Sequence, residues 1–105
     1  MTTMANISGA WTVHLTFILG EATHAAVLVQ SGNTLSGTYR GNITTGDITG
    51  TVDGDRVVFS TTLRYETTRI PMTFTGTIHG DTMSGEVDQG EYWKAQWRAE
   101  RRTAP

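Results

Sequence analysis

The sequence predicts an all-β fold, an eight-stranded antiparallel up-and-down β-barrel, and three observations support this prediction. The chain has 105 residues with twelve glycines and only two prolines, a composition that suits strands and turns better than helices. Apolar and polar residues alternate with a period of two in eight segments, as in half-buried strands. The connections are short and no helix is available to cover a sheet, which favours closure into a barrel over a two-sheet sandwich.

Four alternating segments make up the first half of the chain. They are Gly9–Leu19, His24–Gln30, Thr34–Arg40 and Asp47–Val52. The residues that share one face are, in the same order, Trp11, Val13, Leu15 and Phe17; His24, Ala26 and Leu28; Leu35, Gly37 and Tyr39; Ile48, Gly50 and Val52. The other face of the second segment is also apolar, so the sequence leaves open which face of this strand points inward.

Four more segments follow in the second half. They are Arg56–Tyr65, Arg69–Ile78, Met83–Asp88 and Tyr92–Arg101. Their shared faces hold Val57, Phe59, Thr61, Leu63 and Tyr65; Ile70, Met72, Phe74, Gly76 and Ile78; Met83, Gly85 and Val87; Trp93, Ala95, Trp97 and Ala99. Glycine recurs at these inward positions in mid-strand, where it either lets a small barrel bend or leaves volume for a ligand. Both interpretations stay open.

The connections predict two unlike ends of the barrel. Three short turns alternate with longer or less regular connections along the chain: Ser31-Gly32-Asn33, Asp53-Gly54-Asp55 and His79-Gly80-Asp81. We call the end with these turns, where the first strand begins, the closed end. The open end carries the connections 20–23, 41–46, 66–68 and 89–91. Binding sites of such folds lie among loops at an open end, so we expect the site there.

Composition excludes several classes of function. The length predicts a single domain over residues 1–105, with an ordered barrel over about 7–102. The chain has no cysteine, which excludes a disulfide scaffold, a thiolate zinc site and a cysteine nucleophile. A net charge of −2 with dispersed basic residues argues against nucleic acid as a partner. With neither a long apolar run nor a leader pattern, we expect no membrane partner and a cytoplasmic location.

No motif for a metal, a cofactor or a known type of catalysis is present. The three histidines are far apart in the sequence and do not have the spacing of metal ligands, so we expect no metal and no cofactor. The acidic residues of the short turns are explained by turn chemistry. His14 shares its face with threonines and is expected in solvent, whereas His24 faces inward only if its strand has the parity of Leu28.

The residues at the closed end resemble those of the calycins, the lipocalin, fatty-acid-binding and avidin-like barrels. Gly9-Ala-Trp11, which opens the first strand, resembles their G-x-W signature. In those families this tryptophan packs at the closed end under an arginine from the last strand. The resemblance assigns that role to Arg101, which we expect to form a cation–π contact with Trp11, and it places Trp97 at the same end.

Two further segments resemble avidin-like proteins in particular. Leu35-Ser-Gly-Thr-Tyr39 is similar to their third strand, and Tyr92-Trp93-Lys94 to the start of their last strand. In that family the tyrosine bonds the ureido oxygen of biotin, and the tryptophan stacks on the ligand across a subunit interface. Val13 stands where the family has a polar ligand-binding residue. We therefore expect the shared architecture without biotin binding.

The alternation of side chains nominates a candidate ligand site at the open end. Its residues are Phe17, His24, Tyr39, Tyr65, Met72, Gln89 and Trp93, with Ile70 nearby. Aromatic walls with a few hydroxyl and imidazole groups suit a small apolar or aromatic ligand. The alternative is that these side chains simply fill the core, because an eight-stranded barrel has little interior to spare.

Three hypotheses about function follow. The first is a binding module for a small hydrophobic or aromatic molecule. The second is a small barrel enzyme, a cyclase or isomerase or another acid–base catalyst, with His24, Tyr39 and Tyr65 as candidate catalytic residues. The third is an accessory domain with a filled barrel. In each case we expect a homo-oligomer, a dimer or tetramer, formed through outer faces that include Val27, Val29 or Val58.

Overall fold

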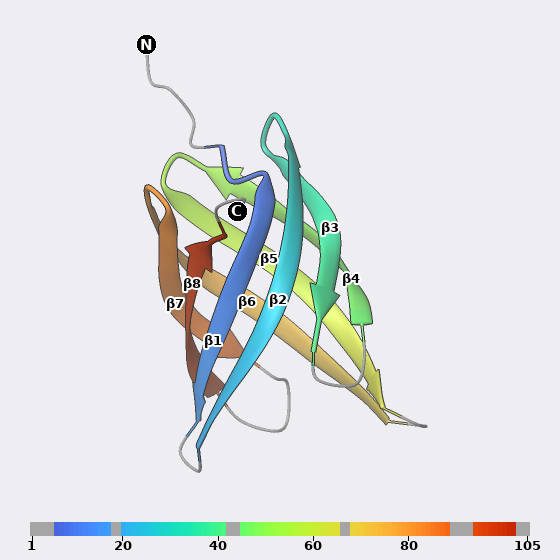
Figure 1. Ribbon diagram of the computed structural model, residues 1–105. Coiled ribbons are helices and arrows are strands. Elements are labelled where there is room, and N and C mark those ends of the chain that lie inside the picture. The colour runs from blue at the N-terminus through green and yellow to red at the C-terminus, as the bar shows by residue number, and fades with distance from the viewer. Residues whose placement is uncertain (1–5, 18–19, 42–44, 66–67, 89–93, 103–105) are drawn as a thin grey trace.

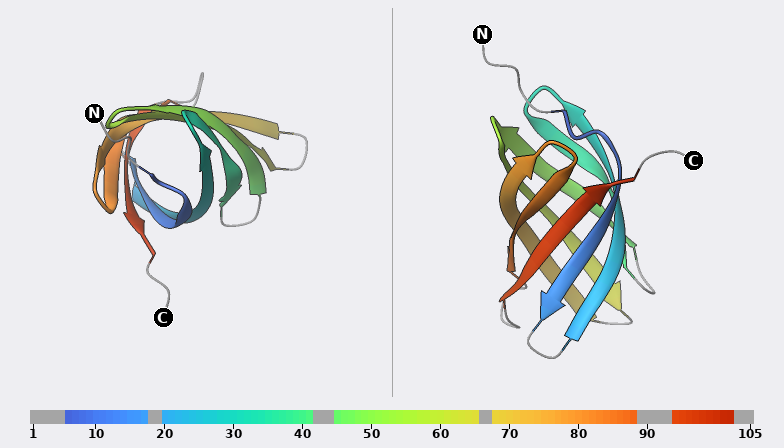
Figure 2. Two further views of the ribbon diagram at one scale, coloured as in Figure 1. Left: turned by 90° about the horizontal axis from the view of Figure 1, so that it is seen from above. Right: turned by 60° about the vertical axis from the view of Figure 1, so that its left-hand side comes forward.

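The strands form one closed antiparallel barrel, which confirms the predicted fold class. The computed structural model describes residues 6–17, 20–41, 45–65, 68–88 and 94–102, without the side chains of 63–65, 68, 70 and 94. Each strand pairs with the next along the chain, and the first pairs with the last. Figure 1 shows the strands crossing the molecule obliquely, and the left view of Figure 2 shows the ring that they close.

Eight strands account for nearly all the described residues, and the described part of the chain contains no helix that could span a membrane. The strands are β1 (Gly9–Phe17), β2 (Gly20–Ser31), β3 (Thr34–Arg40), β4 (Thr45–Asp53), β5 (Arg56–Tyr65), β6 (Thr68–His79), β7 (Thr82–Asp88) and β8 (Lys94–Arg101).

Three of the open-end connections are shorter than the sequence predicts, because the ladders of hydrogen bonds continue through them. Thr68, placed by the sequence in the connection 66–68, belongs to β6 and pairs with Tyr65. Residues 20–23 belong to β2, which pairs with β1 down to Phe17 and Gly20. Thr45 and Gly46 belong to β4 and pair with the end of β3. Figure 1 shows the hairpin of β5 and β6 diverging from that of β1 and β2 at this end.

The structure decides which face of β2 points inward. Ala26 and Leu28 are buried, whereas Val27 and Val29 are 51% and 53% exposed. The registers explain the choice, because Ala26 pairs with the buried Trp11 on one side and with the buried Tyr39 on the other. His24 has the parity of Ala26 and therefore lies on the inner face.

Aromatic rings fill the middle of the barrel. Phe59 and Phe74 stack with centroids 4.6 Å apart, and Trp97 meets both edge-on at 5.6 and 5.3 Å. The sequence placed Trp97 at the closed end, and this was wrong: it pairs with Leu15, four residues from Arg101 along β8. Its indole N–H donates to the carbonyl of Thr75 (3.2 Å), which holds the ring across the interior.

Paired glycines make room for this ring. Gly76 and Gly85 lie opposite each other on β6 and β7. A Cβ at Gly76 would be 2.8 Å from an atom of the Trp97 ring, and one at Gly85 would be 1.9 Å from the carbonyl oxygen of Thr75. These two inward glycines therefore allow a close approach of backbone and ring, a role that the sequence did not distinguish from bending or ligand space.

The three short turns close one end of the barrel. Each has a two-residue loop whose first residue is a glycine with φ of +62°, +63° or +64°, at Gly32, Gly54 and Gly80. Backbone hydrogen bonds then connect each turn to the next hairpin, and β8 to β1. They run from Val52 to Asn33 (2.8 Å), Ile78 to Asp55 (2.6 Å), Arg101 to Asp81 (2.9 Å) and Arg102 to Ala10 (2.8 Å).

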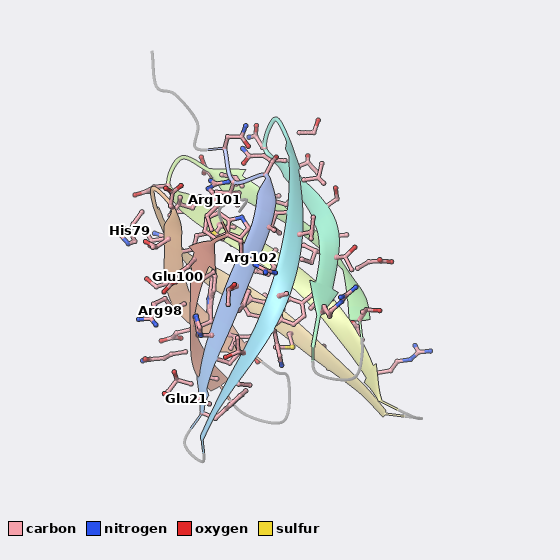
Figure 3. The ribbon with its side chains drawn as sticks, in the orientation of Figure 1. Glu21, His79, Arg98, Glu100, Arg101 and Arg102 are labelled. Atoms are coloured by element: carbon pink, nitrogen blue, oxygen red, sulfur yellow. The ribbon has the colours of Figure 1, made fainter. Side chains whose placement is uncertain are left out.

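The segment before β1 covers the closed end and is held there by Arg101. The guanidinium donates to the carbonyls of Ser8 (2.7 Å) and Asn6 (2.9 Å) and to Asp81 Oδ1 (2.9 Å). Its carbon lies 4.7 Å from the centroid of the Trp11 ring, so the cation–π contact expected from the sequence is present. Figure 3 shows Arg101 at this end of the barrel.

Ile7 completes this end and was missed in the sequence. Its side chain is fully buried, its N–H donates to the side-chain oxygen of Gln30 (2.9 Å), and its carbonyl accepts from the indole of Trp11 (2.9 Å). A single apolar residue in a polar segment gives no periodic signal, so only the structure shows that it caps the core.

Candidate functional site

One polar feature of the inner wall toward the open end is a hydrogen-bonded pair of His24 and Tyr39. The imidazole Nδ1 and the phenol oxygen are 2.6 Å apart, and the two rings meet edge-on with centroids 5.3 Å apart. β2 and β3 bring the residues together, because Tyr39 pairs with Ala26, two residues along β2 from His24. Tyr39 is fully buried, whereas His24 is only half-buried and lies nearer the open end.

Burial keeps both members of the pair neutral. It lowers the pKa of His24 below its usual value and raises the pKa of Tyr39. The phenol proton needs an acceptor, and among the described residues the imidazole nitrogen is the one within reach. We therefore assign the Tyr39 hydroxyl as donor to Nδ1, which leaves the proton of the neutral ring on Nε2. The described residues make no hydrogen bond to that nitrogen.

The rings of the interior form the floor beneath this pair. Tyr39 and Phe74 have centroids 5.5 Å apart, and Phe74 continues into the stack with Phe59 and Trp97. Rings in contact at these distances occupy the middle of the barrel. A ligand that enters from the open end would therefore rest on Tyr39 and Phe74.

The structure places two more of the residues that the sequence nominated. Phe17 is partly buried and packs on the core near the end of β1, and Met72 on β6 is fully buried. Gln89 and Trp93 lie outside the described residues, as do the side chains of Tyr65 and Ile70. His24, Tyr39, Phe17 and Met72 are thus the part of the predicted site that the structure describes.

Thr61 is a residue of this region that the sequence did not nominate. It lies on β5 opposite Met72, it is 4% exposed, and its hydroxyl has no hydrogen-bond partner among the described residues. A buried hydroxyl without a partner costs about 1–3 kcal/mol. The signal in the sequence is a threonine in line with Val57 and Phe59 on an otherwise apolar face.

Two hollows of the outer wall are larger than a third one, of about 250 Å³, over β6 and β7, and both are polar. One, of about 510 Å³, crosses β2, β1, β8 and β7 and includes His14, Gln96 and Arg98. The other, of about 600 Å³, lies over β4, β5 and β6 and includes Asp47, Ser60 and Arg69. Neither has the apolar surface that a small hydrophobic ligand requires, and both are wide open to solvent.

The fold and the site define a class of protein, a small closed β-barrel with an aromatic interior and a half-buried neutral histidine toward its open end. No protein-family model and no curated protein sequence matches the chain. Within the described ranges, no group of three histidine, aspartate or glutamate side chains could hold a metal ion.

We expect His24 to make the stability depend on pH. In the unfolded chain the imidazole gains a proton below a pKa of about 6.5, whereas in the folded protein burial delays this to lower pH. Its contribution to the free energy of unfolding is therefore complete above pH 6.5 and is lost as the pH falls toward the lowered pKa.

Denaturant unfolding between pH 5 and 7.5 measures this effect. The loss of stability on acidification should be smaller in His24→Gln than in the wild type, because the glutamine does not titrate. His79→Gln, at an exposed turn of the closed end, is the matched control and should keep the slope of the wild type. Equal slopes in all three proteins would contradict the prediction.

Proposed function

We propose that this protein binds a small apolar or aromatic molecule at the open end of its barrel. The observation that carries the proposal is the hydrogen-bonded pair of His24 and Tyr39, in which Tyr39 also contacts the buried ring of Phe74. Small-molecule sites combine apolar walls with a few polar groups that orient the ligand, and this region has both. The ligand would stack on the floor and accept a hydrogen bond from Nε2.

The architecture supports a calycin-like barrel as the finer proposal. Trp11 lies under Arg101 at the closed end, and the guanidinium ties the segment before β1 to β8. This is the arrangement that the G-x-W resemblance implies. Calycin-like barrels that bind ligands do so at the opposite end, which agrees with the position of His24.

Acetophenone tests the binding function, because it combines one aromatic ring with one carbonyl acceptor and carries no charge. We expect its addition to shift the backbone amide resonances of β2 and β3 near His24, with saturable binding. His24→Leu removes the donor, so we expect a dissociation constant about tenfold higher, the effect of about 1.4 kcal/mol for one hydrogen bond.

His79→Leu makes the same change at the exposed turn of the closed end and should leave the affinity unchanged. Absence of saturable binding to the wild type, or equal affinities for the wild type and His24→Leu, would contradict the proposed function.

Acid–base catalysis on an apolar substrate is the second candidate. It is favoured by the same pair, since a neutral imidazole bonded to a buried phenol can donate or accept a proton. The two functions differ in what His24→Leu removes: a binding protein loses about tenfold in affinity, whereas an enzyme loses orders of magnitude in turnover with substrate still bound.

A second copy of the chain is the proposed protein partner. Val27, Val29 and Val58 are exposed on the outer wall, at 51%, 53% and 40%. Val27 and Val29 pair with Thr38 and Ser36 of β3, so this part of the wall combines apolar and uncharged side chains. Such a wall favours the predicted dimer or tetramer. The cytoplasmic location stays a prediction.

A further inference from the structure

The buried hydroxyl of Thr61 has no hydrogen-bond partner among the described residues. Polar groups inside proteins are nearly always hydrogen-bonded, and Thr61 Oγ1 is the exception among the described side chains. A valine has the same shape and suits a strand at least as well. Threonine at this position therefore weakens the fold without improving its packing, and residues that do so gather at functional sites.

The registers place this hydroxyl on the inner wall, on β5, two strands from Tyr39 and three strands from His24. Tyr39 on β3 pairs with Gly46 on β4. A Cβ at Gly46 would be 2.5 Å from Thr61 Oγ1, so the hydroxyl occupies the space that a side chain there would fill. On the other side of β5, Thr61 pairs with Met72 of β6. The hydroxyl thus lies on the inner wall one strand beyond Gly46, between Tyr39 and Met72.

Met72 is the side chain that a ligand can displace to reach the hydroxyl. It is 1% exposed and lies directly across the ladder from Thr61. Methionine is unbranched and adopts many conformations, so it yields to a ligand at a lower cost than a ring or a β-branched side chain.

We propose that Thr61 is a second polar anchor of the ligand site, and that the ligand is an uncharged molecule with hydrogen-bonding groups at both ends of an apolar or aromatic body. One group bonds His24 and the other bonds Thr61 Oγ1. The inference rests on the proposed function and adds the chemical class of the ligand.

The absence of charge follows from the interior. Apart from Thr61, the described residues buried in the barrel are apolar or aromatic. Arg101, at the closed end, already bonds two carbonyls and Asp81. A carboxylate or an ammonium group of a ligand would therefore be buried without a charged partner, which is strongly unfavourable.

Two matched probes test the second anchor. Acetophenone has one hydrogen-bonding group, and 4′-hydroxyacetophenone adds a hydroxyl at the far end of the same ring. We expect the wild type to bind 4′-hydroxyacetophenone about tenfold more tightly, the gain of one further hydrogen bond. Thr61→Val should abolish this difference. Thr61→Ser, which keeps the hydroxyl, should retain it.

Thermal unfolding supplies an independent readout. We expect Thr61→Val to raise the midpoint of the free protein by about 5 °C, because it removes the unpaired hydroxyl. Thr61→Val would then be more stable than the wild type and would bind 4′-hydroxyacetophenone more weakly. A lower midpoint would show that the hydroxyl is already satisfied in the free protein and would overturn the inference.

The outcomes separate this inference from the proposed function. If acetophenone does not bind the wild type, both the proposed function and the inference that rests on it are wrong. If acetophenone binds but the added hydroxyl gives no gain, or a gain that survives in Thr61→Val, only the second anchor fails. If 4-hydroxybenzoate, whose carboxylate is charged, binds as tightly as 4′-hydroxyacetophenone, the uncharged class of ligand is wrong.

Discussion

Arg101→Met should lower the free energy of unfolding by about 3 kcal/mol and the thermal midpoint by about 15 °C. The side chain donates three hydrogen bonds, to Ser8, Asn6 and Asp81, and covers the ring of Trp11. Methionine can keep part of the packing on the ring but none of the hydrogen bonds. The segment before β1 would then lose its connection to β8, and solvent would reach the buried Ile7.

Arg98→Met is the matched control for this prediction. Arg98 lies three residues earlier on β8, on the outer face in Figure 3, with 65% of its side chain exposed. It forms one exposed ion pair, with Glu100 at 3.8 Å, and such pairs contribute little. We expect a change within about 0.5 kcal/mol. The thermal midpoints of the two variants can be measured by circular dichroism. If both midpoints fall by the same amount, Arg101 does not hold the closed end together.

Gly85→Ala should destabilise the protein by about 3 kcal/mol or more, an overpacking effect at the upper end of the usual range. The added Cβ would lie 1.9 Å from the carbonyl oxygen of Thr75 and 2.6 Å from the Cα of Gly76. Both contacts are with backbone of the neighbouring strand, which cannot move without breaking the ladder between β6 and β7. The ring of Trp97, which lies over Gly76, would have to shift as well.

Gly54→Ala separates this clash from the general cost of replacing a glycine. At Gly54 the added Cβ meets nothing within 4 Å, and only the positive φ of +63° is unfavourable. That strain costs about 1–2 kcal/mol. Denaturant unfolding of the two variants measures the difference, and a smaller loss for Gly85→Ala than for Gly54→Ala would contradict the packing described for Trp97.

Alternation along the chain was enough to predict the eight strands and their order, and the glycine turns predicted the closed end. Each strand except β2 has one apolar face, and consecutive antiparallel strands with short connections have few other ways to enclose those faces. The contact of Arg101 with Trp11 was also predictable, because the G-x-W resemblance and the parity of the last strand point to the same residue.

Other features depend on packing between strands, which a single sequence does not carry. Both faces of β2 are apolar, so the inward position of His24 follows only from the registers with β1 and β3. The position of Trp97 depends on the glycine pair of β6 and β7. Thr61 was overlooked because threonine is common in strands and its missing partner becomes visible only when its neighbours are placed.

The central claim is that the open end of the barrel receives a small uncharged ligand, and intermolecular nuclear Overhauser effects with acetophenone test it most directly. We predict contacts from the methyl and ring protons of acetophenone to the imidazole of His24 and the methyl group of Met72. Contacts confined to the hollow over β2, β1, β8 and β7, for example to Thr16 and Thr23, would contradict the central claim. The ligand would then bind on the outer wall and not inside the barrel.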